Sequence, residues 1–404
     1  MDVGANVRAV VVHDAFVQAG GGERVAAQLA VTLGGAPVFT AAIREGMVPA
    51  PLRAGDLRTS TLSSLVRRGL PLAAVAPLLP AVFARMDLGT PDVVVSSSSA
   101  FAHHVRVPAG TVHVCYCHTP PRFLWELDEY FHGQPSRRRL LAPGLAALRR
   151  LDLAASRGVD LYVANSRHIA ARIERVYGRR ALVAYPPVET RSFLPSTERS
   201  GRFLVVSRLR NHKRVDLAVA AANLLRQPLD IVGAGPELDT LRRAAGPTVR
   251  FLGPRSDGEV RYAMARCAGV LVPAPQDFGL TLVEAQASGR PPIAYADGGA
   301  SEIVDDGRTG FLFRAATPEA LAEAMLRAVH TPLETAALVR SAARFDVEVF
   351  RGAIDDAVGQ ALGVRATGEA LGVRATGEAR VARSRGAPSP LLVAGDHEGA
   401  IGAE

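Results

Sequence analysis

Lysine is nearly absent from this chain of 404 residues. Lysine and arginine together number 47, and Lys213 is the only lysine among them. An ammonium is a compact point charge with rotatable donors, whereas a guanidinium is a planar fork, so the two are not interchangeable. The retention of one ammonium makes Lys213 a leading candidate for a binding or catalytic site, with chance retention as the alternative.

Cysteines and long apolar segments are also scarce. The three cysteines, Cys115, Cys117 and Cys267, have neither the spacing of a disulfide framework nor that of a zinc site, which predicts a reducing, cytoplasmic location. The best candidate for a membrane span, residues 69–84, is interrupted by prolines, so no spanning helix is predicted. The first residues lead almost directly into a strand, so no secretory signal is expected.

The charge balance indicates an anionic partner, because the net charge is +8 and the isoelectric point is about 10.0. Nucleic acid is disfavoured, since the basic residues are not interleaved with aromatic ones and no nucleic-acid-binding motif is present. Basic clusters beside apolar residues predict either solvated helix faces or peripheral contact with an anionic membrane, namely the inner face of the plasma membrane. These clusters are Arg67-Arg68, Arg137–Arg139, Arg149-Arg150 and Arg179-Arg180.

The first half of the chain alternates apolar strand-like runs with helical segments, which predicts a parallel sheet. A buried strand at Arg8–Phe16 precedes a glycine loop, Gly20–Gly22, and a helix at Val25–Leu33. The dinucleotide fingerprint would require glycine at position 25, so an NAD site is disfavoured. His118 ends a further strand, where open α/β sheets bind ligands, although a polar surface residue at a strand end is the alternative.

The second half repeats the strand–helix pattern after Pro186-Pro187, which is typical of a linker. We therefore predict two parallel-sheet domains, over 1–187 and 188–345. A terminal helix over 346–360 is expected to cross back to the first domain. Residues 361–404 contain an exact nine-residue duplication, 361–369 and 370–378, and are predicted to form a disordered or loosely helical tail.

The segment around Gly279 has the pattern of an anion site. A strand at 270–272 runs through a Pro-Ala-Pro stop to Gly279 and then to a helix that contains Glu284. The unpaired N–H groups of a helix N-terminus and the helix dipole bind anions, and a carboxylate one turn later can accept hydrogen bonds from a ribose diol. Arg208 lies at the end of another predicted strand, 203–209, and Lys213 is predicted to begin the following helix, 213–225. Two cations at this place could hold a diphosphate leaving group. A nucleotide is therefore the predicted ligand.

The series of motifs in the second half resembles the retaining glycosyltransferases of family 4, which have the GT-B fold of two Rossmann-like parallel-sheet domains that face a central cleft. The motifs that carry this resemblance are Ser207-Arg-Leu-x3-Lys213, Val232-Gly-Ala-Gly-Pro236, Phe251-Leu-Gly253, Asp277-Phe-Gly-Leu-Thr-Leu-Val-Glu284, Gly298-Gly299 and Gly307-Arg-Thr-Gly310. In the first half, Gly20–Arg24 and Tyr116–Pro120 also match this family. The second of these motifs, with Arg122 and Trp125, most resembles bacterial mannosyltransferases that build O-antigen, exopolysaccharide or lipid-linked glycans. The resemblance implies that the first domain binds the acceptor and the second domain binds the nucleotide sugar.

The resemblance implies roles for particular residues. Arg208 and Lys213 correspond to the diphosphate-binding pair, Glu284 to the acid that holds the ribose, and His118 to the histidine near the 6-hydroxyl of the donor sugar. The catalytic set is thus His118, Arg208, Lys213 and Glu284. The remaining donor-binding positions are predicted to be Gly21, Gly22, Ser207, Gly233, Gly253, Arg255, Gln276, Phe278, Gly279, Leu280 and Thr281.

Gln276 departs from the family pattern, because it occupies the position of the first acid of an E-x7-E motif. Glutamine can bind hydroxyl groups, but it cannot act as a carboxylate nucleophile. The resemblance then implies transfer of a hexose, mannose from GDP-mannose, to a glycan or lipid-linked acceptor by a front-face mechanism, without a metal or other cofactor. The alternatives are a catalytically silent nucleotide-sugar-binding protein and an epimerase of the same fold.

Overall fold

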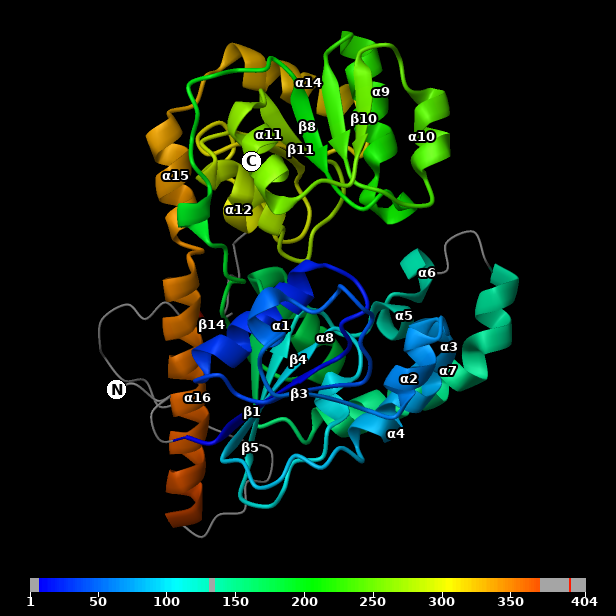
Figure 1. Cartoon of the computed structure of the whole chain (residues 1–404), viewed down its shortest axis with the longest axis vertical. Coiled ribbons are helices and arrows are strands. Elements are labelled where there is room, and N and C mark those ends of the chain that lie inside the picture. Colours follow the sequence, from blue (N-terminus) through cyan, green and yellow to red (C-terminus); the bar gives the residue numbers. More distant parts are fainter. Residues whose placement is uncertain (1–6, 131–134, 371–391, 394–404) are drawn as a thin grey trace, which may run out of the picture. The chain divides into compact units, whose positions relative to one another are not determined.

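A computed structural model describes residues 7–130, 135–370 and 392–393, and these divide into two compact units (Figure 1). The first unit contains the chain up to Tyr185 together with the segment from Phe350 onward, and the second contains Pro186–Val349. The sequence placed the corresponding boundaries at 187 and 345. Each unit has its own parallel sheet and its own apolar core.

The sheet of the first unit has the strand order β14-β7-β6-β5-β4-β1-β2-β3. All pairings are parallel except that of β14 with β7. Every residue of the neighbouring strands β4 and β5 is buried, which is the pattern expected of a parallel sheet that is covered on both faces. The strands are β1 (Ala9–His13), β2 (Val38–Thr40), β3 (Leu57–Thr59), β4 (Val93–Ser98), β5 (Val112–Cys117), β6 (Leu161–Ala164), β7 (Ala181–Val183) and β14 (Leu392–Val393).

Helices connect these strands. In α8, Ser166 caps the N-terminus by accepting a hydrogen bond from the Ile169 N–H, and Gly178 ends the helix in the left-handed region. The helices of this unit are α1 (Gly21–Thr32), α2 (Leu62–Arg67), α3 (Leu72–Val75), α4 (Leu79–Phe83), α5 (Arg122–Trp125), α6 (Leu127–Tyr130), α7 (Pro135–Ser156), α8 (Arg167–Tyr177) and most of α16 (Val347–Ala370).

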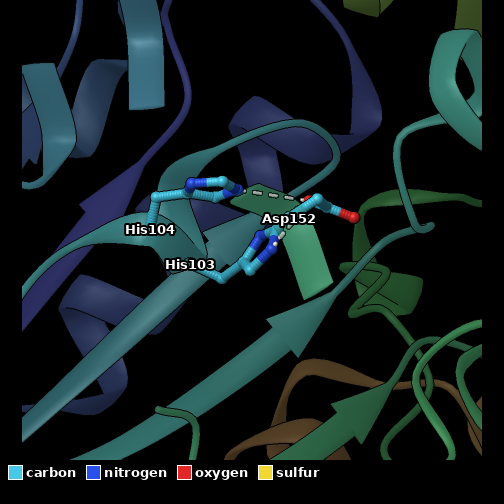
Figure 2. Close-up of side chains that lie close together, drawn as sticks. All are labelled: His103, His104 and Asp152. Carbon is cyan, nitrogen blue, oxygen red and sulfur yellow. Dashed lines mark hydrogen bonds and ion pairs between the residues drawn. The ribbon is translucent and has the colours of Figure 1, made fainter. Parts of the chain in front are cut away.

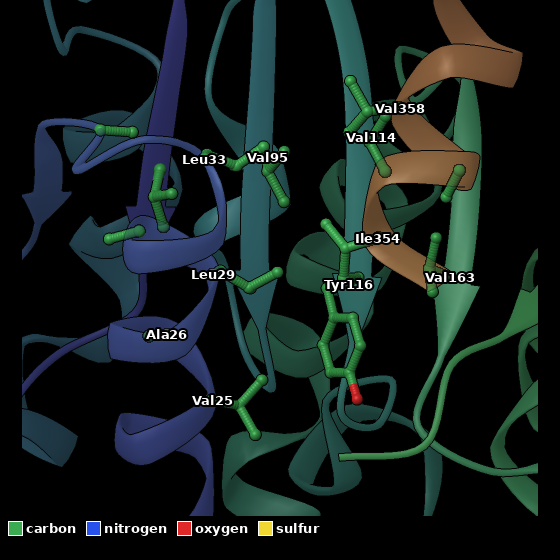
Figure 3. Packing of buried hydrophobic residues seen from close by; sticks show 14 of the residues in the cluster. Val25, Ala26, Leu29, Leu33, Val95, Val114, Tyr116, Val163, Ile354 and Val358 are labelled. Atoms are coloured by element: carbon green, nitrogen blue, oxygen red, sulfur yellow. The ribbon is translucent and has the colours of Figure 1, made fainter. Parts of the chain in front are cut away.

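The last helix, α16, completes the core of the first unit. Ile354 and Val358 belong to the same buried cluster as Val114 and Tyr116 of β5, and Figure 3 shows them packed over that strand. Val25, Leu29 and other residues of α1 belong to this cluster as well. Helix α16 therefore stabilises the sheet by packing on β5, a strand more than two hundred positions earlier in the chain.

The predicted tail is partly ordered. Helix α16 continues to Ala370, through the first copy of the nine-residue duplication, and Leu392–Val393 pairs with β7. The helix that continues to Ala370 corresponds to the helical alternative that the sequence left open for the tail, whereas the pairing of Leu392–Val393 was not predicted. Alanine, leucine, arginine and glutamate favour helix and outnumber the two glycines of the repeat. The second copy beyond Ala370 lies outside the described residues.

The sheet of the second unit has the strand order β10-β9-β8-β11-β12-β13, with all strands parallel. This is the 3-2-1-4-5-6 order of a Rossmann fold, in which β8 is the first strand and β11 the fourth. The strands are β8 (Phe203–Val206), β9 (Leu229–Val232), β10 (Val249–Gly253), β11 (Gly269–Val272), β12 (Pro292–Tyr295) and β13 (Phe311–Phe313).

Two helices of the second unit begin with recognisable caps. Ser256 begins α11 with a reciprocal capping box to Glu259, and Thr317 caps α14 ahead of Pro318. The helices are α9 (Val215–Leu225), α10 (Leu238–Ala244), α11 (Asp257–Arg266), α12 (Leu280–Ala287), α13 (Ala300–Ile303), α14 (Pro318–His330) and α15 (Thr335–Ala343).

All three cysteines are free and buried. Burial raises the pKa of the Cys267 thiol to about 12, which keeps it protonated and unreactive at neutral pH. Among the residues that the structure describes, no helix combines the length and the apolar character needed to cross a membrane.

Candidate functional site

The predicted phosphate-binding residues of the second unit lie at one point of its sheet. Strands β8 and β11 are neighbours, and the strand order reverses between them. The loops that follow these two strands leave the same edge of the sheet, because all strands are parallel. Open α/β sheets bind their ligands at such a switch point, outside the carboxyl ends of the strands.

Lys213 and Gln276 meet across this switch point. The Nζ atom of Lys213 lies 3.5 Å from the Oε1 atom of Gln276, although the two residues are 63 positions apart. Both side chains are partly exposed, so a ligand at the strand ends can reach them. The structure therefore brings together the unique lysine and the glutamine that replaces an expected acid.

The predicted start of the following helix at Lys213 is wrong. Residues Asn211–Lys213 form a 3-10 turn, Arg214 has a φ of 50°, and α9 begins only at Val215. The left-handed residue interrupts the helical path, which separates the ammonium from the first turn of α9. Lys213 thus belongs to the loop at the strand ends.

The loop after β8 is held against the loop after β9. The Ser207 N–H donates to the Val232 carbonyl over 3.1 Å, and the Leu209 N–H donates to the Ala234 carbonyl over 2.9 Å. A Cβ atom on Gly233 would lie 1.9 Å from the Ser207 carbonyl oxygen, so only glycine permits this approach. Arg208 is exposed in the same loop. The predicted Ser207, Arg208 and Gly233 are therefore part of one packed loop pair.

The backbone of Gln276 is fixed by a glycine pair. Its carbonyl accepts a hydrogen bond of 2.7 Å from the Gly299 N–H, and a Cβ atom on Gly298 would lie 2.1 Å from the same oxygen. In its side chain, Nε2 donates to the Ala274 carbonyl over 2.9 Å. With Nε2 engaged, Oε1 is the atom that faces Lys213.

Helix α12 begins directly after this segment. Gly279 is its N-cap with a φ of 114°, which favours glycine, and Leu280 and Thr281 form the first turn. The first N–H groups of a helix have no partner within the helix, so this turn offers donors to an anion. Glu284 lies one turn further along and is partly exposed, as the sequence predicted.

Three other predicted donor-binding residues, Phe278, Gly253 and Arg255, are not part of the contact between Lys213 and Gln276 described above. Phe278 is buried and its ring lies 5.4 Å from that of Phe345, so its side chain packs in the core and only its backbone can contact a ligand. Gly253 ends β10 at the edge of the sheet with a φ of 72°. The guanidinium of Arg255, two residues later, lies 3.4 Å from the Glu259 carboxylate.

In the first unit, His118 follows β5 and contacts the neighbouring strand β4. Its Nε2 atom lies 2.8 Å from the Ser97 hydroxyl, which lies 3.1 Å from Nδ1 of His13. The Asn165 side chain donates to the His118 carbonyl over 3.0 Å. Both ring orientation and backbone position of His118 are therefore restrained by side chains at the strand ends.

Gly22 lies beside the ring of His118. A Cβ atom at this position would be 3.7 Å from Nε2, so the glycine leaves the ring edge uncovered. The expected glycine loop is wrong, because α1 already begins at Gly21 and Gly20 is its extended N-cap. None of these glycines has a positive φ, so none of them is required by a left-handed turn.

The sequence did not identify the residues that form hydrogen bonds at the carboxyl ends of β1 and β4, near His118. The carboxylate of Asp14, just after β1, accepts hydrogen bonds from the backbone N–H groups of four consecutive residues, 99–102. Ser97 and His13 were also missed. The available signal was the run of four serines at 96–99, since polar residues at the carboxyl end of a buried strand are unusual in a core.

Two family models match consecutive parts of the chain. The model described as "Glycosyltransferase Family 4" matches residues 19–192, and the one described as "Glycosyl transferases group 1" matches residues 200–331. These matches correspond to the two units and cover most of the described residues.

Curated relatives match over shorter segments. A glycogen synthase of Xanthomonas campestris pv. campestris is 37% identical over 139 residues, which is 32% of this chain and 29% of the relative. A D-inositol 3-phosphate glycosyltransferase of Nocardioides sp. is 39% identical over 106 residues, which is 26% of this chain and 21% of the relative. The matched segments thus span less than a third of these relatives.

Solved structures match over nearly the whole chain. HepE of Anabaena, solved in complex with UDP and glucose, has a TM-score of 0.64 at 20% identity and covers 88% of this chain and 100% of its own. Sucrose-phosphate synthase of Thermosynechococcus elongatus has a TM-score of 0.68 at 17% identity, covering 90% and 100%. With two Rossmann-like units and two successive glycosyltransferase matches, this chain carries the domains of a glycosyltransferase of the GT-B fold.

Proposed function

We propose that this protein transfers a hexose from a nucleotide diphosphate sugar to a glycan or lipid-linked acceptor, with retention of configuration at the anomeric carbon. The observation that carries the proposal is the meeting of Lys213 and Gln276 at the switch point of a Rossmann-type sheet, directly before the N-terminus of α12. A cation, an amide and a helix N-terminus together suit a sugar diphosphate.

Each residue has a role in the proposed reaction. Lys213 and Arg208 neutralise the diphosphate, and the N–H groups at the start of α12 bind its oxygens. Glu284 accepts hydrogen bonds from the ribose hydroxyls, and Gln276 binds hydroxyls of the transferred sugar. His118, in the first unit, binds the 6-hydroxyl. These residues require no metal, since the two cations supply the positive charge.

The proposed transfer proceeds on one face of the sugar. The bond between the anomeric carbon and the diphosphate oxygen breaks, and the acceptor oxygen forms the new bond from the same side. The acceptor proton passes to an oxygen of the departing diphosphate. Gln276 cannot form a covalent glycosyl intermediate as a carboxylate would, which supports this front-face route.

The donor that we propose is GDP-mannose, on the resemblance of the Tyr116–Pro120 segment to mannosyltransferases. A thermal-shift panel of GDP-mannose, UDP-glucose and ADP-glucose tests it. A ligand at a hundred times its dissociation constant adds about 2.7 kcal/mol to the unfolding free energy, so the preferred donor is expected to raise the melting temperature most. Stabilisation by UDP-glucose alone would exclude GDP-mannose, and no shift with any donor would contradict nucleotide-sugar binding.

A catalytically silent binding protein is the alternative that Gln276 itself suggests. The variant Gln276→Glu separates the two functions. If the wild-type protein is an enzyme, turnover of the variant is expected to stay within about tenfold, because both side chains present an oxygen to sugar hydroxyls. Negligible wild-type turnover that rises by orders of magnitude in Gln276→Glu would identify a silent protein, with donor hydrolysis and acceptor transfer measured in the same assay.

An anionic membrane surface is the further partner that we propose. Helix α7 presents Leu140 with 80% of its surface exposed, next to the exposed Arg137 and Arg139. An apolar side chain flanked by cations is suited to the interface of an anionic bilayer.

Changing Arg137, Arg138 and Arg139 to glutamine is expected to weaken binding to phosphatidylglycerol vesicles roughly 100-fold, because each basic residue contributes about 1 kcal/mol near such a surface. Changing the exposed Arg242 and Arg243 of α10 provides the control. Binding that persists in high salt, or on purely neutral vesicles, would contradict electrostatic docking.

A further inference from the structure

Two histidines and an aspartate meet in the interior of the first unit, and none of the three belongs to the proposed donor-binding residues. His103 and His104 end a 3-10 turn after β4, and Asp152 lies in α7 (Figure 2). The Nε2 atoms of the two histidines lie 3.1 and 3.2 Å from the same carboxylate oxygen, Oδ1 of Asp152. The exposed fractions of the three side chains are only 3%, 5% and 0%.

The geometry of His103 is not that of an ordinary hydrogen bond. Its Nε2 atom lies within hydrogen-bond distance of Oδ1 of Asp152, yet it has no hydrogen-bond partner of acceptable direction among the described residues. An unsatisfied buried ring nitrogen is costly unless another group uses it. A metal ion would do so, because it binds the lone pair of a neutral ring nitrogen.

The groups around the cluster resemble the outer contacts of a metal site. The Nδ1 atom of His103 lies 3.0 Å from the Ser98 hydroxyl. The second carboxylate oxygen, Oδ2 of Asp152, accepts hydrogen bonds from Trp125 Nε1 over 2.7 Å and from the Tyr177 hydroxyl over 2.9 Å. Such contacts orient metal-binding histidines and carboxylates and leave the ligand atoms directed at one centre.

We propose that Nε2 of His103, Nε2 of His104 and Oδ1 of Asp152 bind a zinc ion. The three ligand atoms lie within 4.8 Å of one another, a spacing that one ion can span with bonds of about 2.0–2.2 Å. Two imidazoles and one carboxylate are a donor set that suits zinc, and the fourth position is left to water.

The ion would have a structural role. It joins the turn that follows β4 to the C-terminal part of α7, two segments separated by 48 residues of sequence. That separation hid the site from sequence analysis, because the ligands do not form a recognisable spacing motif. The proposal is independent of the transfer reaction, for which no metal is proposed.

Metal analysis of the full-length protein, produced with zinc in the medium, tests this inference. The wild-type chain is expected to retain about one zinc ion per chain, and removal by a chelator is expected to lower its melting temperature until zinc chloride restores it. The variant His104→Gln is expected to lose the ion, since glutamine keeps an N–H donor near Asp152 but is a poor zinc ligand. The variant His330→Ala, at the exposed end of α14, is the matched control and is expected to retain it.

Three results would overturn the proposal. The first is a wild-type chain that contains almost no zinc and whose melting temperature is unaffected by chelator or by zinc chloride. The second is equal zinc content in wild type and His104→Gln. If His104→Gln does not fold, the wild-type chain is loaded with cobalt instead, because cobalt bound at the site gives a visible ligand-field spectrum. The absence of that spectrum is the third result that would contradict zinc binding. Asp152 would then be only an acceptor of hydrogen bonds.

Discussion

Replacing Lys213 with alanine is expected to lower the turnover number for sugar transfer by about 10²–10³-fold, the usual cost of removing one group that stabilises developing charge. The ammonium lies at the carboxyl ends of β8 and β11, 3.5 Å from the side chain proposed to hold the sugar. It is thus placed where negative charge would accumulate as the diphosphate departs. Its removal leaves that charge with less compensation in the transition state.

The fold of Lys213→Ala is expected to be unchanged, because the residue ends a short turn and its side chain is partly exposed. Arg210→Ala is the matched control, since it removes an exposed cation from the same loop. Its turnover should remain near that of the wild type. Lys213→Arg keeps the charge but changes its shape, and intermediate activity is expected. Turnover of Lys213→Ala equal to that of the control would remove the basis of the proposed mechanism.

The composition of the chain identified Lys213 as a candidate, and the structure places it beside Gln276 at the carboxyl ends of β8 and β11. A single ammonium among arginines stands out without any knowledge of the fold. The order of strands and helices in the second unit was equally accessible, because buried parallel strands are continuous apolar runs and the helices between them have recognisable caps. Sequence periodicity and capping are local signals, and local signals were sufficient here.

Features that depend on contacts between distant segments could not be predicted in the same way. The glycines at 20–22 were interpreted as a loop, but Gly22 lies in the first turn of α1 beside the ring of His118, which comes almost a hundred positions later. The contact of Ser97 with His13 and His118 requires the pairing of β4 with both β1 and β5. Contacts between residues of different strands do not produce a periodic pattern in the sequence, so sequence analysis does not predict them.

The position of Lys213 also shows the limit of helix prediction. Val215 and the following residues have a clear helical pattern, and nothing local separates them from the preceding turn. The separation comes from Arg214, which adopts a left-handed conformation that is uncommon for arginine. Because surrounding contacts must stabilise such a conformation, it is visible only in the structure.

Replacing Gly298 with alanine is expected to destabilise the second unit by roughly 2–5 kcal/mol. The new Cβ atom would lie 2.1 Å from the Gln276 carbonyl oxygen, so the backbone would have to move, at a cost of about 1–3 kcal/mol for overpacking. A φ of 69° adds about 1–2 kcal/mol for any residue with a Cβ atom. The movement would also displace Gln276, and weaker donor binding is therefore expected.

Gly201→Ala separates the two contributions. Gly201 has a similar φ of 66° in the same unit, but no heavy atom lies within 4 Å of its ideal Cβ position. This control should lose only the conformational term of about 1–2 kcal/mol and keep the donor affinity of the wild type. Peptide-resolved hydrogen exchange over 269–295 is the appropriate measurement, because the only tryptophan, Trp125, lies in the other unit. Equal protection in the two variants would show that the contact between Gly298 and Gln276 does not position the sugar-binding side chain.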